Sequence, residues 1–205
     1  MVYALQWDQM KGFDYLHPQG FYDAITAYGL PSEIIKLDMA AQKDMKVFIW
    51  TAYGTTGPIV LNGVMKQGGL LSPLKSTMTT SMGHHYLDDL ACNLPDMLII
   101  NSKTKVHSPD DLRRLPVTMV EATDNFYIFA LTLQALHSLC LEMEHFQFAY
   151  GWLMQWMKMS AYVLGPSSSN PDMVSMPSIT IQDGIHPHTV TWHNVPLRVS
   201  ELEFL

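Results

Sequence analysis

Two runs of strand-forming residues, only three positions apart, constrain this fold more than any other feature. Residues 117–122 and 126–131 are rich in β-branched and aromatic side chains, and Thr123-Asp124-Asn125 lies between them. Asp and Asn tolerate the backbone conformations that tight turns require. The two runs are therefore predicted to pair as an antiparallel hairpin. Because Asp-Asn is ordinary turn chemistry, the hairpin alone predicts structure and not function.

Helical patterns supply a second layer for this sheet. Apolar residues recur at three- and four-residue steps from Leu133 to Met157 and predict a long helix. A second long helix is predicted from Ser72 to about residue 92, with Ser72 as N-cap and Pro73 at the first helical position. Shorter helices are expected over 20–29 and 32–43, strands over 2–7, 46–52, 59–61, 96–101 and 161–164, a turn at 54–58, an exposed connection over 102–115, and short strand-like pieces after 177. This order predicts an α+β fold, a mainly antiparallel sheet with helices on one face.

Composition narrows the class of protein. The chain has 205 residues, of which 48% are hydrophobic and 15% charged, so we expect a packed core rather than disorder. No apolar run approaches the ~20 residues that cross a bilayer, and the N-terminus lacks signal-peptide features. Cys92 and Cys140 have no metal-binding spacing, which favours a reducing compartment. We therefore expect an intracellular protein, cytoplasmic or nuclear, that is not secreted and has no membrane partner. The net charge of −7 argues against a free-standing nucleic-acid binder.

Three aspartates are candidates for chemistry. Asp8 ends the first strand, Asp14 lies in the following turn, and Asp124 lies at the hairpin tip. Antiparallel packing of the first strand beside the hairpin would bring Asp8 and Asp124 to one sheet edge. Two neighbouring carboxylates repel unless a cation lies between them, and oxygen ligands favour Mg²⁺. The alternative is that all three are turn residues and that Gly63, Gly68 and Gly69 only permit a tight turn.

Histidines offer two further metal hypotheses. His84-His85 precedes Asp88-Asp89 on a predicted helix, but adjacent helical residues point about 100° apart, which favours a solvated face. His186, His188 and His193 crowd the tail, and zinc would need a fourth ligand there.

Four segments in order resemble motifs of the reverse transcriptase palm, of the non-LTR (LINE-like) retroelement type. DQMKGFD (8–14) resembles the first motif and GVMKQGGLLSP (63–73) the second, which is the most specific of the four. EATDNFYIFA (121–130) stands where that family has its aspartate hairpin, and GWLMQWMKMSAYVL (151–164) resembles the lysine motif that follows. SELEFL (200–205) is similar to the start of the next motif.

The resemblance implies a retrotransposon-type RNA-directed DNA polymerase that performs two-metal nucleotidyl transfer. Its catalytic residues would be Asp8, Asp124 and Lys158. Two Mg²⁺ or Mn²⁺ ions would be held by Asp8 and Asp124, with Asn125 as a weak ligand. Phe13, Gln67, Gly68 and Ser72 would bind the deoxynucleoside triphosphate: Phe13 would exclude a ribose 2′-OH, Gln67 would contact the nucleotide, Gly68 would give it room, and Ser72 would fix the helix behind. An RNA or DNA template-primer would be the other partner.

The sequence also departs from the family pattern. Asn125 replaces the second hairpin aspartate, Ala122 the aromatic residue before it, and Leu70 a proline of the second motif. We expect residues 1–164 to form the palm and 165–205 a loop and short-strand tail at the start of the connection to the thumb. Complete fingers and thumb are not expected in this chain and would come from a longer polyprotein. The alternative function is an inactive retroelement remnant that acts only as a binding or scaffold module.

Overall fold

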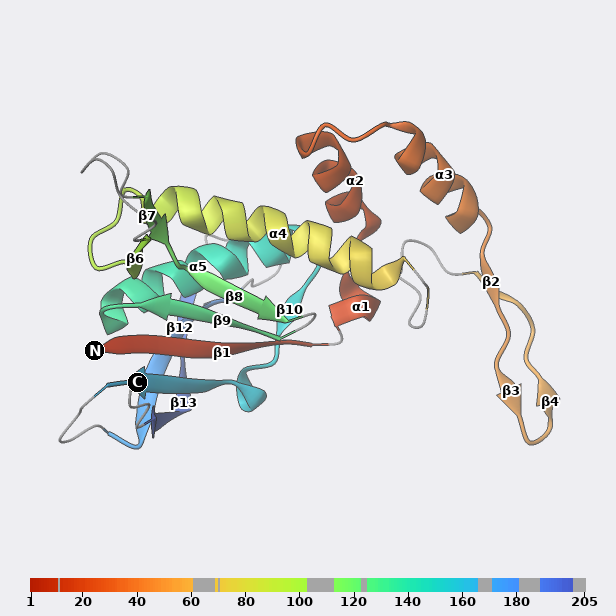
Figure 1. The fold of residues 1–205 in the computed structure, drawn as a ribbon. Helices are drawn as coiled ribbons and strands as arrows, with labels where there is room; N and C mark the ends of the chain where they lie inside the picture. Colours follow the sequence, from red (N-terminus) through yellow and green to blue (C-terminus); the bar gives the residue numbers. More distant parts are fainter. Residues whose placement is uncertain are drawn as a thin grey trace.

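The computed structural model describes residues 1–10, 12–60, 69, 71–102, 113–122, 125–165, 171–180 and 189–200. Its main sheet has the strand order β12-β13-β11-β1-β9-β8, and β10 pairs with β1. These strands are β1 (Val2–Met10), β8 (Met119–Ala122), β9 (Asn125–Ala130), β10 (Leu153–Met154), β11 (Ser160–Leu164), β12 (Met173–Thr180) and β13 (Thr189–Ser200). Figure 1 shows β1 near the middle of this sheet.

The predicted hairpin is confirmed, and β1 lies beside it. β8 and β9 pair antiparallel, and β9 pairs antiparallel with β1 from Tyr3↔Ala130 to Asp8↔Asn125. On its other side β1 pairs antiparallel with β11, while β11 and β13 pair parallel. The predicted α+β class with a mainly antiparallel sheet is confirmed.

Two long helices, α4 (Ser72–Ala91) and α5 (Leu133–Ala149), lie over β1, β8 and β9 on one face (Figure 1). The Thr132 hydroxyl accepts a hydrogen bond of 3.2 Å from the Ala135 amide and caps the start of α5. The prediction that this helix continues to Met157 is wrong. Gly151 has φ = 89°, a conformation that favours glycine, and the chain turns there into β10.

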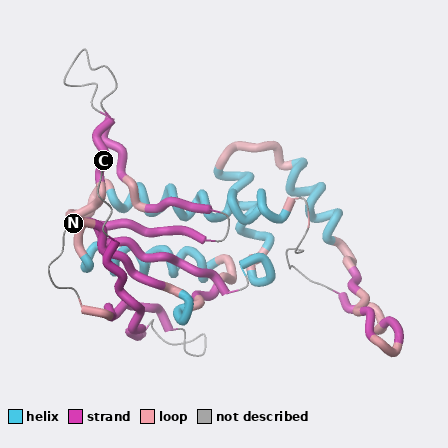
Figure 2. The backbone as a smooth tube through the Cα atoms, turned by 60° about the horizontal axis from the view of Figure 1, so that its bottom comes forward, coloured by secondary structure: helices cyan, strands magenta, loops and turns pink. Residues whose placement is uncertain are grey.

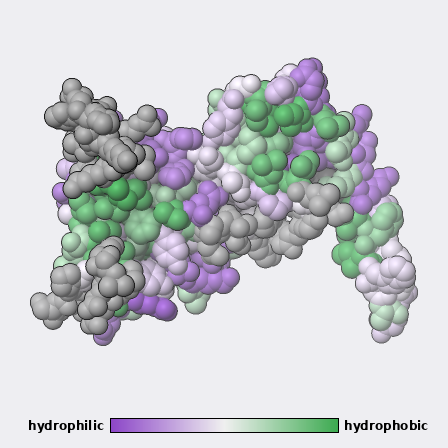
Figure 3. Space-filling view, viewed as in Figure 1, coloured by the Kyte–Doolittle hydropathy of each residue, from purple (hydrophilic) through white to green (hydrophobic). Residues whose placement is uncertain are grey.

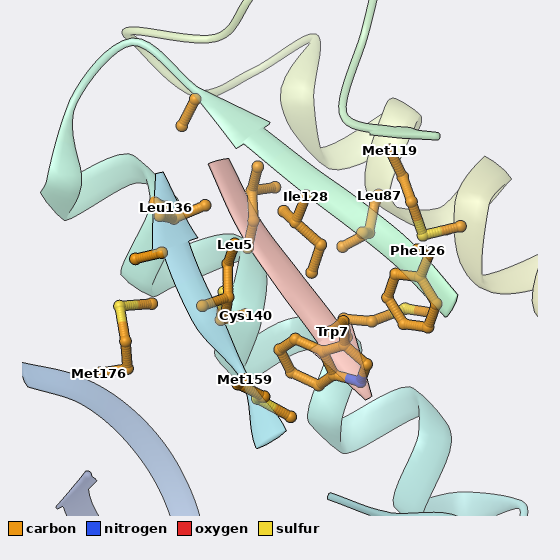
Figure 4. Close-up of a cluster of buried hydrophobic side chains, with 14 of the residues drawn as sticks. Leu5, Trp7, Leu87, Met119, Phe126, Ile128, Leu136, Cys140, Met159 and Met176 are labelled. Carbon is orange, nitrogen blue, oxygen red and sulfur yellow. The ribbon is translucent and has the colours of Figure 1, made fainter. Parts of the chain in front are cut away.

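The core fills the space between the sheet and these helices. Trp7 is fully buried and stacks on Phe126 with ring centroids 5.7 Å apart. Figure 4 shows these two rings with Met119 and Leu87 beside Phe126 and Met159 nearer Trp7. Methionines thus fill core space, as their flexible side chains allow. Leu5, Trp7, Phe126 and Ile128 are all buried on this face, so alternate residues of β1 face the other way.

A second region extends from one end of the sheet. It contains α1 (Gly12–Tyr15), α2 (Pro18–Ala27), α3 (Glu33–Gln42) and residues 43–60. We call residues 43–60 alone the arm. The arm is a ribbon in which β2 (Lys46–Val47) pairs with β5 (Ile59–Val60) and β3 (Trp50–Thr51) with β4 (Gly54–Thr55). Figure 2 shows α3 and the arm projecting away from the sheet. Figure 3 shows apolar surface on the arm, where the exposed large residues are Phe48, Ile49, Trp50, Tyr53, Ile59 and Val60.

Several local predictions need correction. The sequence pattern predicts Gly54 and Thr55 in a turn, whereas they form β4. Residues of the predicted exposed connection form β7 (Arg113–Pro116), which pairs with β6 (Ile99–Ser102). The tail contains two long strands, β12 and β13, rather than short pieces, and β13 joins the main sheet. Within the described residues, no helix is both long enough and apolar enough to cross a membrane.

Candidate functional site

Asp8 lies near the end of β1, on the sheet face opposite the helices. Its neighbour Trp7 is buried and hydrogen-bonded to Gln147 of α5, and successive side chains of a strand point to opposite faces. The Asp8 side chain is 22% exposed. The Gln155 amide donates a hydrogen bond of 3.0 Å to the Asp8 carbonyl oxygen, which ties this end of β1 to the chain that follows β10. The carboxylate is therefore held on a fixed strand and is reachable from solvent.

Lys158 lies next to Asp8. It ends a short 3₁₀ turn, η2 (Trp156–Lys158), and its Nζ is 3.9 Å from Asp8 Oδ1. The Lys158 side chain is 66% exposed, so this ion pair contributes little to stability. The ammonium group is instead free to approach a ligand bound near Asp8. The resemblance places both residues in one site, and the structure brings them together.

Trp156 anchors the turn that carries Lys158. Its Nε1 donates a hydrogen bond of 3.0 Å to Ser178 Oγ, and its ring meets the edge of Trp7 at a centroid distance of 6.0 Å. The His193 ring also stacks on Trp156, with ring centroids 4.8 Å apart and the two planes almost parallel. His193 is thus engaged with a tryptophan, while His186 and His188 lie outside the described residues. On α4, His84 Nε2 lies 3.6 Å from Asp88 Oδ2 at the surface, in line with the predicted solvated face.

The remaining predicted site residues are only partly covered. The backbone of Asn125 pairs directly with that of Asp8. Phe13 lies on α1, immediately after β1. Neither the Asn125 nor the Phe13 side chain is described. Asp124, Gln67 and Gly68 lie outside the described residues, so their place in the site remains a prediction.

Ser72 is positioned differently from the prediction. It is the first residue of α4, with Leu71 as N-cap, so its predicted capping role is wrong. Ser72 is 6% exposed, and its amide donates a 3.1 Å hydrogen bond to the Gly69 carbonyl oxygen. The serine therefore lies inside the structure at the point where the second motif becomes a helix.

The sequence reasoning missed a buried ion pair one turn further along α4. Lys75 Nζ contacts Asp38 Oδ1 of α3, and both side chains are buried. Tyr22 Oη and Gln42 Nε2 donate hydrogen bonds of 3.1 and 2.5 Å to Asp38 Oδ2. The sequence contains a signal for this buried charge, because Asp38 stands three residues after Ile35, which packs against α2. A charge at such a position needs a partner.

The metal hypothesis rests on a limited set of described ligands. Asp8 supplies an oxygen ligand of the kind that Mg²⁺ prefers, on a solvent-reachable rim. No group of three His, Cys, Asp or Glu side chains suited to a metal ion occurs among the described residues. Asp8 can supply one of the carboxylate ligands of a metal site. Its predicted partner Asp124 lies outside the described residues.

No family model matches the sequence, and no curated protein matches it. Three similar solved structures are telomerases. Apo telomerase from Candida tropicalis, truncated from its C-terminal domain, has a TM-score of 0.51 at 14% identity, over 84% of this chain and 32% of that one. C. tropicalis telomerase with a TWJ fragment of telomeric RNA has a TM-score of 0.53 at 13% identity, over 78% and 26%. The Candida albicans telomerase with the same kind of fragment has a TM-score of 0.50 at 11% identity, over 85% and 28%.

These comparisons show the fold and nothing finer. The chain spans less than a third of the length of each telomerase, at 26% to 32% of their residues. Telomerase is related to reverse transcriptases. The likeness therefore supports the reverse-transcriptase part of the resemblance and leaves the non-LTR branch to the sequence motifs. The chain has a reverse-transcriptase-like α+β fold.

Proposed function

We propose that this chain is the palm of an RNA-directed DNA polymerase. The observation that carries the proposal is the rim at the end of β1, where Asp8 faces solvent, Lys158 Nζ lies 3.9 Å away, and the backbone of Asn125 is paired opposite. The reverse-transcriptase-like fold supports it. The motifs at 8–14 and 63–73 assign the enzyme to the non-LTR retroelement type. Its partners are an RNA or DNA template-primer and deoxynucleoside triphosphates, and the telomerase structures that contain an RNA fragment support a nucleic-acid partner.

Each residue has a distinct role in this proposal. Asp8 and Asp124 hold two Mg²⁺ or Mn²⁺ ions. When bound, such ions activate a hydroxyl nucleophile and stabilise the leaving pyrophosphate. Lys158 places a positive charge beside the same rim, where it stabilises the charge that develops on the leaving phosphate.

The nucleotide is selected by the residues that follow β1 and precede α4. Phe13 excludes a ribose 2′-OH by steric overlap, which favours deoxynucleotides. Gln67 contacts the nucleotide, and Gly68 leaves space for it. Buried Ser72 fixes the start of α4 behind this turn.

A second candidate function follows from Asn125. An amide at this position brings no negative charge, so metal binding is weaker than with the aspartate of the family. Because residue 125 is the direct backbone partner of Asp8, the loss falls at the centre of the proposed site. This favours an inactive remnant that binds nucleic acid or acts as a scaffold.

Primer extension separates the two candidates. The chain is assayed with Mg²⁺ or Mn²⁺ on an RNA template, alongside Asp8→Ala, Asn125→Asp and the control Asp89→Ala, whose carboxylate lies exposed on α4. Extension by the unaltered chain that is lost only in Asp8→Ala supports the polymerase. Extension only in Asn125→Asp supports the inactive remnant. Extension that survives in Asp8→Ala overturns the site assignment.

A further inference from the structure

A cavity of about 460 Å³ is lined by α5 on the helix side of the sheet and by β10, which pairs with the end of β1. The end of α5, β10 and the β12–β13 pair enclose it, and its lining includes Glu144, Phe148, Trp152 and Leu153. Phe148 and Leu153 are 42% and 40% exposed, whereas Trp152 is fully buried. The opening is therefore apolar and the wall behind it aromatic. Its size is within the range of about 300–1,000 Å³ that is usual for small-molecule sites.

Glu144 is the acidic group that lines this cavity, and it is almost fully buried. Ser178 Oγ donates a hydrogen bond of 2.8 Å to its Oε1, and the Ile179 amide donates one of 2.6 Å to its Oε2. These bonds join α5 to β12. They occupy part of the capacity of a carboxylate, which offers about four lone-pair sites. The carboxylate also lines the cavity, where a ligand can approach it.

No ion pair within the described part of the chain includes Glu144, and His193 is the basic side chain in the cavity lining. The ion pairs of that part are Lys75–Asp38, His84–Asp88 and Lys158–Asp8. Burial raises the pKa of the Glu144 carboxyl, while the Ile179 amide, the Ser178 hydroxyl and the nearby Trp156 indole act in the opposite direction. A buried carboxylate without a cation is costly in free energy, and a cation in the adjoining cavity would remove that cost.

We propose that this cavity binds a small organic cation, with an amidinium, guanidinium or ammonium group directed at Glu144 and an apolar body between Phe148 and Leu153. Charge complementarity selects the cation, and the aromatic rings of Phe148 and Trp152 add cation–π attraction. The lining suits a cation that carries an apolar body, because it combines apolar side chains such as Phe148 and Trp152 with the polar ones of Glu144, Ser178, Thr191 and His193. The site is independent of the polymerase proposal, since it uses none of the same side chains.

Benzamidine and benzamide provide a matched pair of probes. Both are flat and of similar size, but only benzamidine is a cation. Binding to the intact chain is followed by NMR from the indole N–H signals of Trp152 and Trp156, each assigned with a Trp→Phe variant. Benzamidine is expected to bind at least about tenfold more tightly than benzamide, as charge-assisted hydrogen bonds require. Equal affinities, or no benzamidine binding, overturn the proposal.

Variants locate the charge that the probe recognises. Glu144→Gln is expected to weaken benzamidine binding by at least about tenfold. Glu142→Gln is the matched control, because Glu142 lies on the same helix but accepts a 2.6 Å hydrogen bond from Tyr86 Oη of α4 instead. An unchanged affinity in Glu144→Gln, or an equal loss in Glu142→Gln, contradicts the site.

A third variant keeps the test decisive if Glu144→Gln does not fold. Phe148 is largely exposed at the opening, so Phe148→Ala is expected to leave the fold intact. It should weaken benzamidine binding by about threefold or more through loss of the ring. An unchanged affinity in this folded variant contradicts the proposed location.

Discussion

The sheet and the arm are stabilised in opposite ways. In the sheet, β1, β8, β9 and β11 contribute to one buried cluster with α4 and α5. In the arm, residues 43–60, every described side chain is at least partly exposed. Helix α3, which leads into the arm, buries only Asp38. The sheet thus depends on many apolar contacts, whereas α3 is attached through one buried carboxylate, Asp38, and the partly buried Ile35.

This difference matters for the proposed function because the second motif follows the arm. Residues 61–70 connect β5 to α4, and α4 begins at Ser72. The Asp38–Lys75 pair joins α3 to α4 across the segment that contains the arm and the second motif, and its two residues are 37 apart in sequence. We therefore expect the geometry around Asp8 to depend on core packing and the entry to α4 to depend on this ion pair.

Trp7→Ala should have the largest effect of any single change. Trp7 is fully buried, stacks on Phe126, and donates a 2.9 Å hydrogen bond from Nε1 to Gln147 Oε1. Removing a buried tryptophan usually costs about 3–5 kcal/mol, a large share of the stability of a typical domain. Urea unfolding followed by circular dichroism measures it. A loss below about 1 kcal/mol would show that this core is not the main source of stability.

Lys75→Met tests the buried ion pair that joins α3 to α4. It leaves the Asp38 carboxylate buried without its cation, which is expected to cost about 3 kcal/mol. Because α3 has few other contacts, the effect should be local. Hydrogen exchange should accelerate in α3 and the first turn of α4 but not in β1 or β9.

The double variant Asp38→Asn with Lys75→Met is the control for this prediction. It removes both charges and should recover most of the lost protection. Acceleration spread evenly over the sheet would mean that α3 and the sheet unfold as one unit.

Glu121→Gln tests a polar group at the edge of the sheet. Glu121 Oε1 is buried, and no hydrogen-bond partner for it occurs among the described residues. Burial raises the pKa of Glu121 to about 7. The folded protein thus retains this proton to a higher pH than the unfolded chain, so the free energy of unfolding falls as the pH rises from about 4.5 to about 7.

The Gln variant cannot ionise and should lack this loss. After allowance for partial solvent screening, it should be more stable than the unaltered chain by about 2 kcal/mol near pH 8 and equally stable near pH 4. Urea unfolding at both pH values measures the difference. If the variant and the unaltered chain differed in free energy of unfolding by the same amount at both pH values, the role of Glu121 would be contradicted.

Local sequence patterns predicted the strands of the main sheet better than the ends of helices and the pairing of distant strands. The hairpin could be predicted from two β-rich runs around Asp124-Asn125, because its two strands are neighbours in the sequence. The end of α5 was missed because Leu153 and Met157 keep the apolar spacing while the positive φ of Gly151 breaks the helix. β7 was missed because its pairing with β6 is a contact between distant residues.

In the candidate site too, the sequence identified individual residues but not the contacts between distant segments. Asp8 and Lys158 were identified from motif resemblance, and their proximity depends on β10 pairing with the end of β1. Residue spacing alone could not predict it. The Asp38–Lys75 pair was missed for the same reason, because its two members belong to separate helices. Asp124, Gln67 and Gly68 remain predictions from the motifs.

Trp50→Ala should have the smallest effect and is the matched partner of Trp7→Ala. Trp50 lies on β3 and is 86% exposed, so its removal uncovers little buried surface. The expected change in the free energy of unfolding is below about 0.5 kcal/mol, at any protein concentration. A larger loss that grows with protein concentration would mean that the apolar residues of the arm pack against another chain in solution. The arm would then be stabilised by burial, as the sheet is, but between molecules rather than within one.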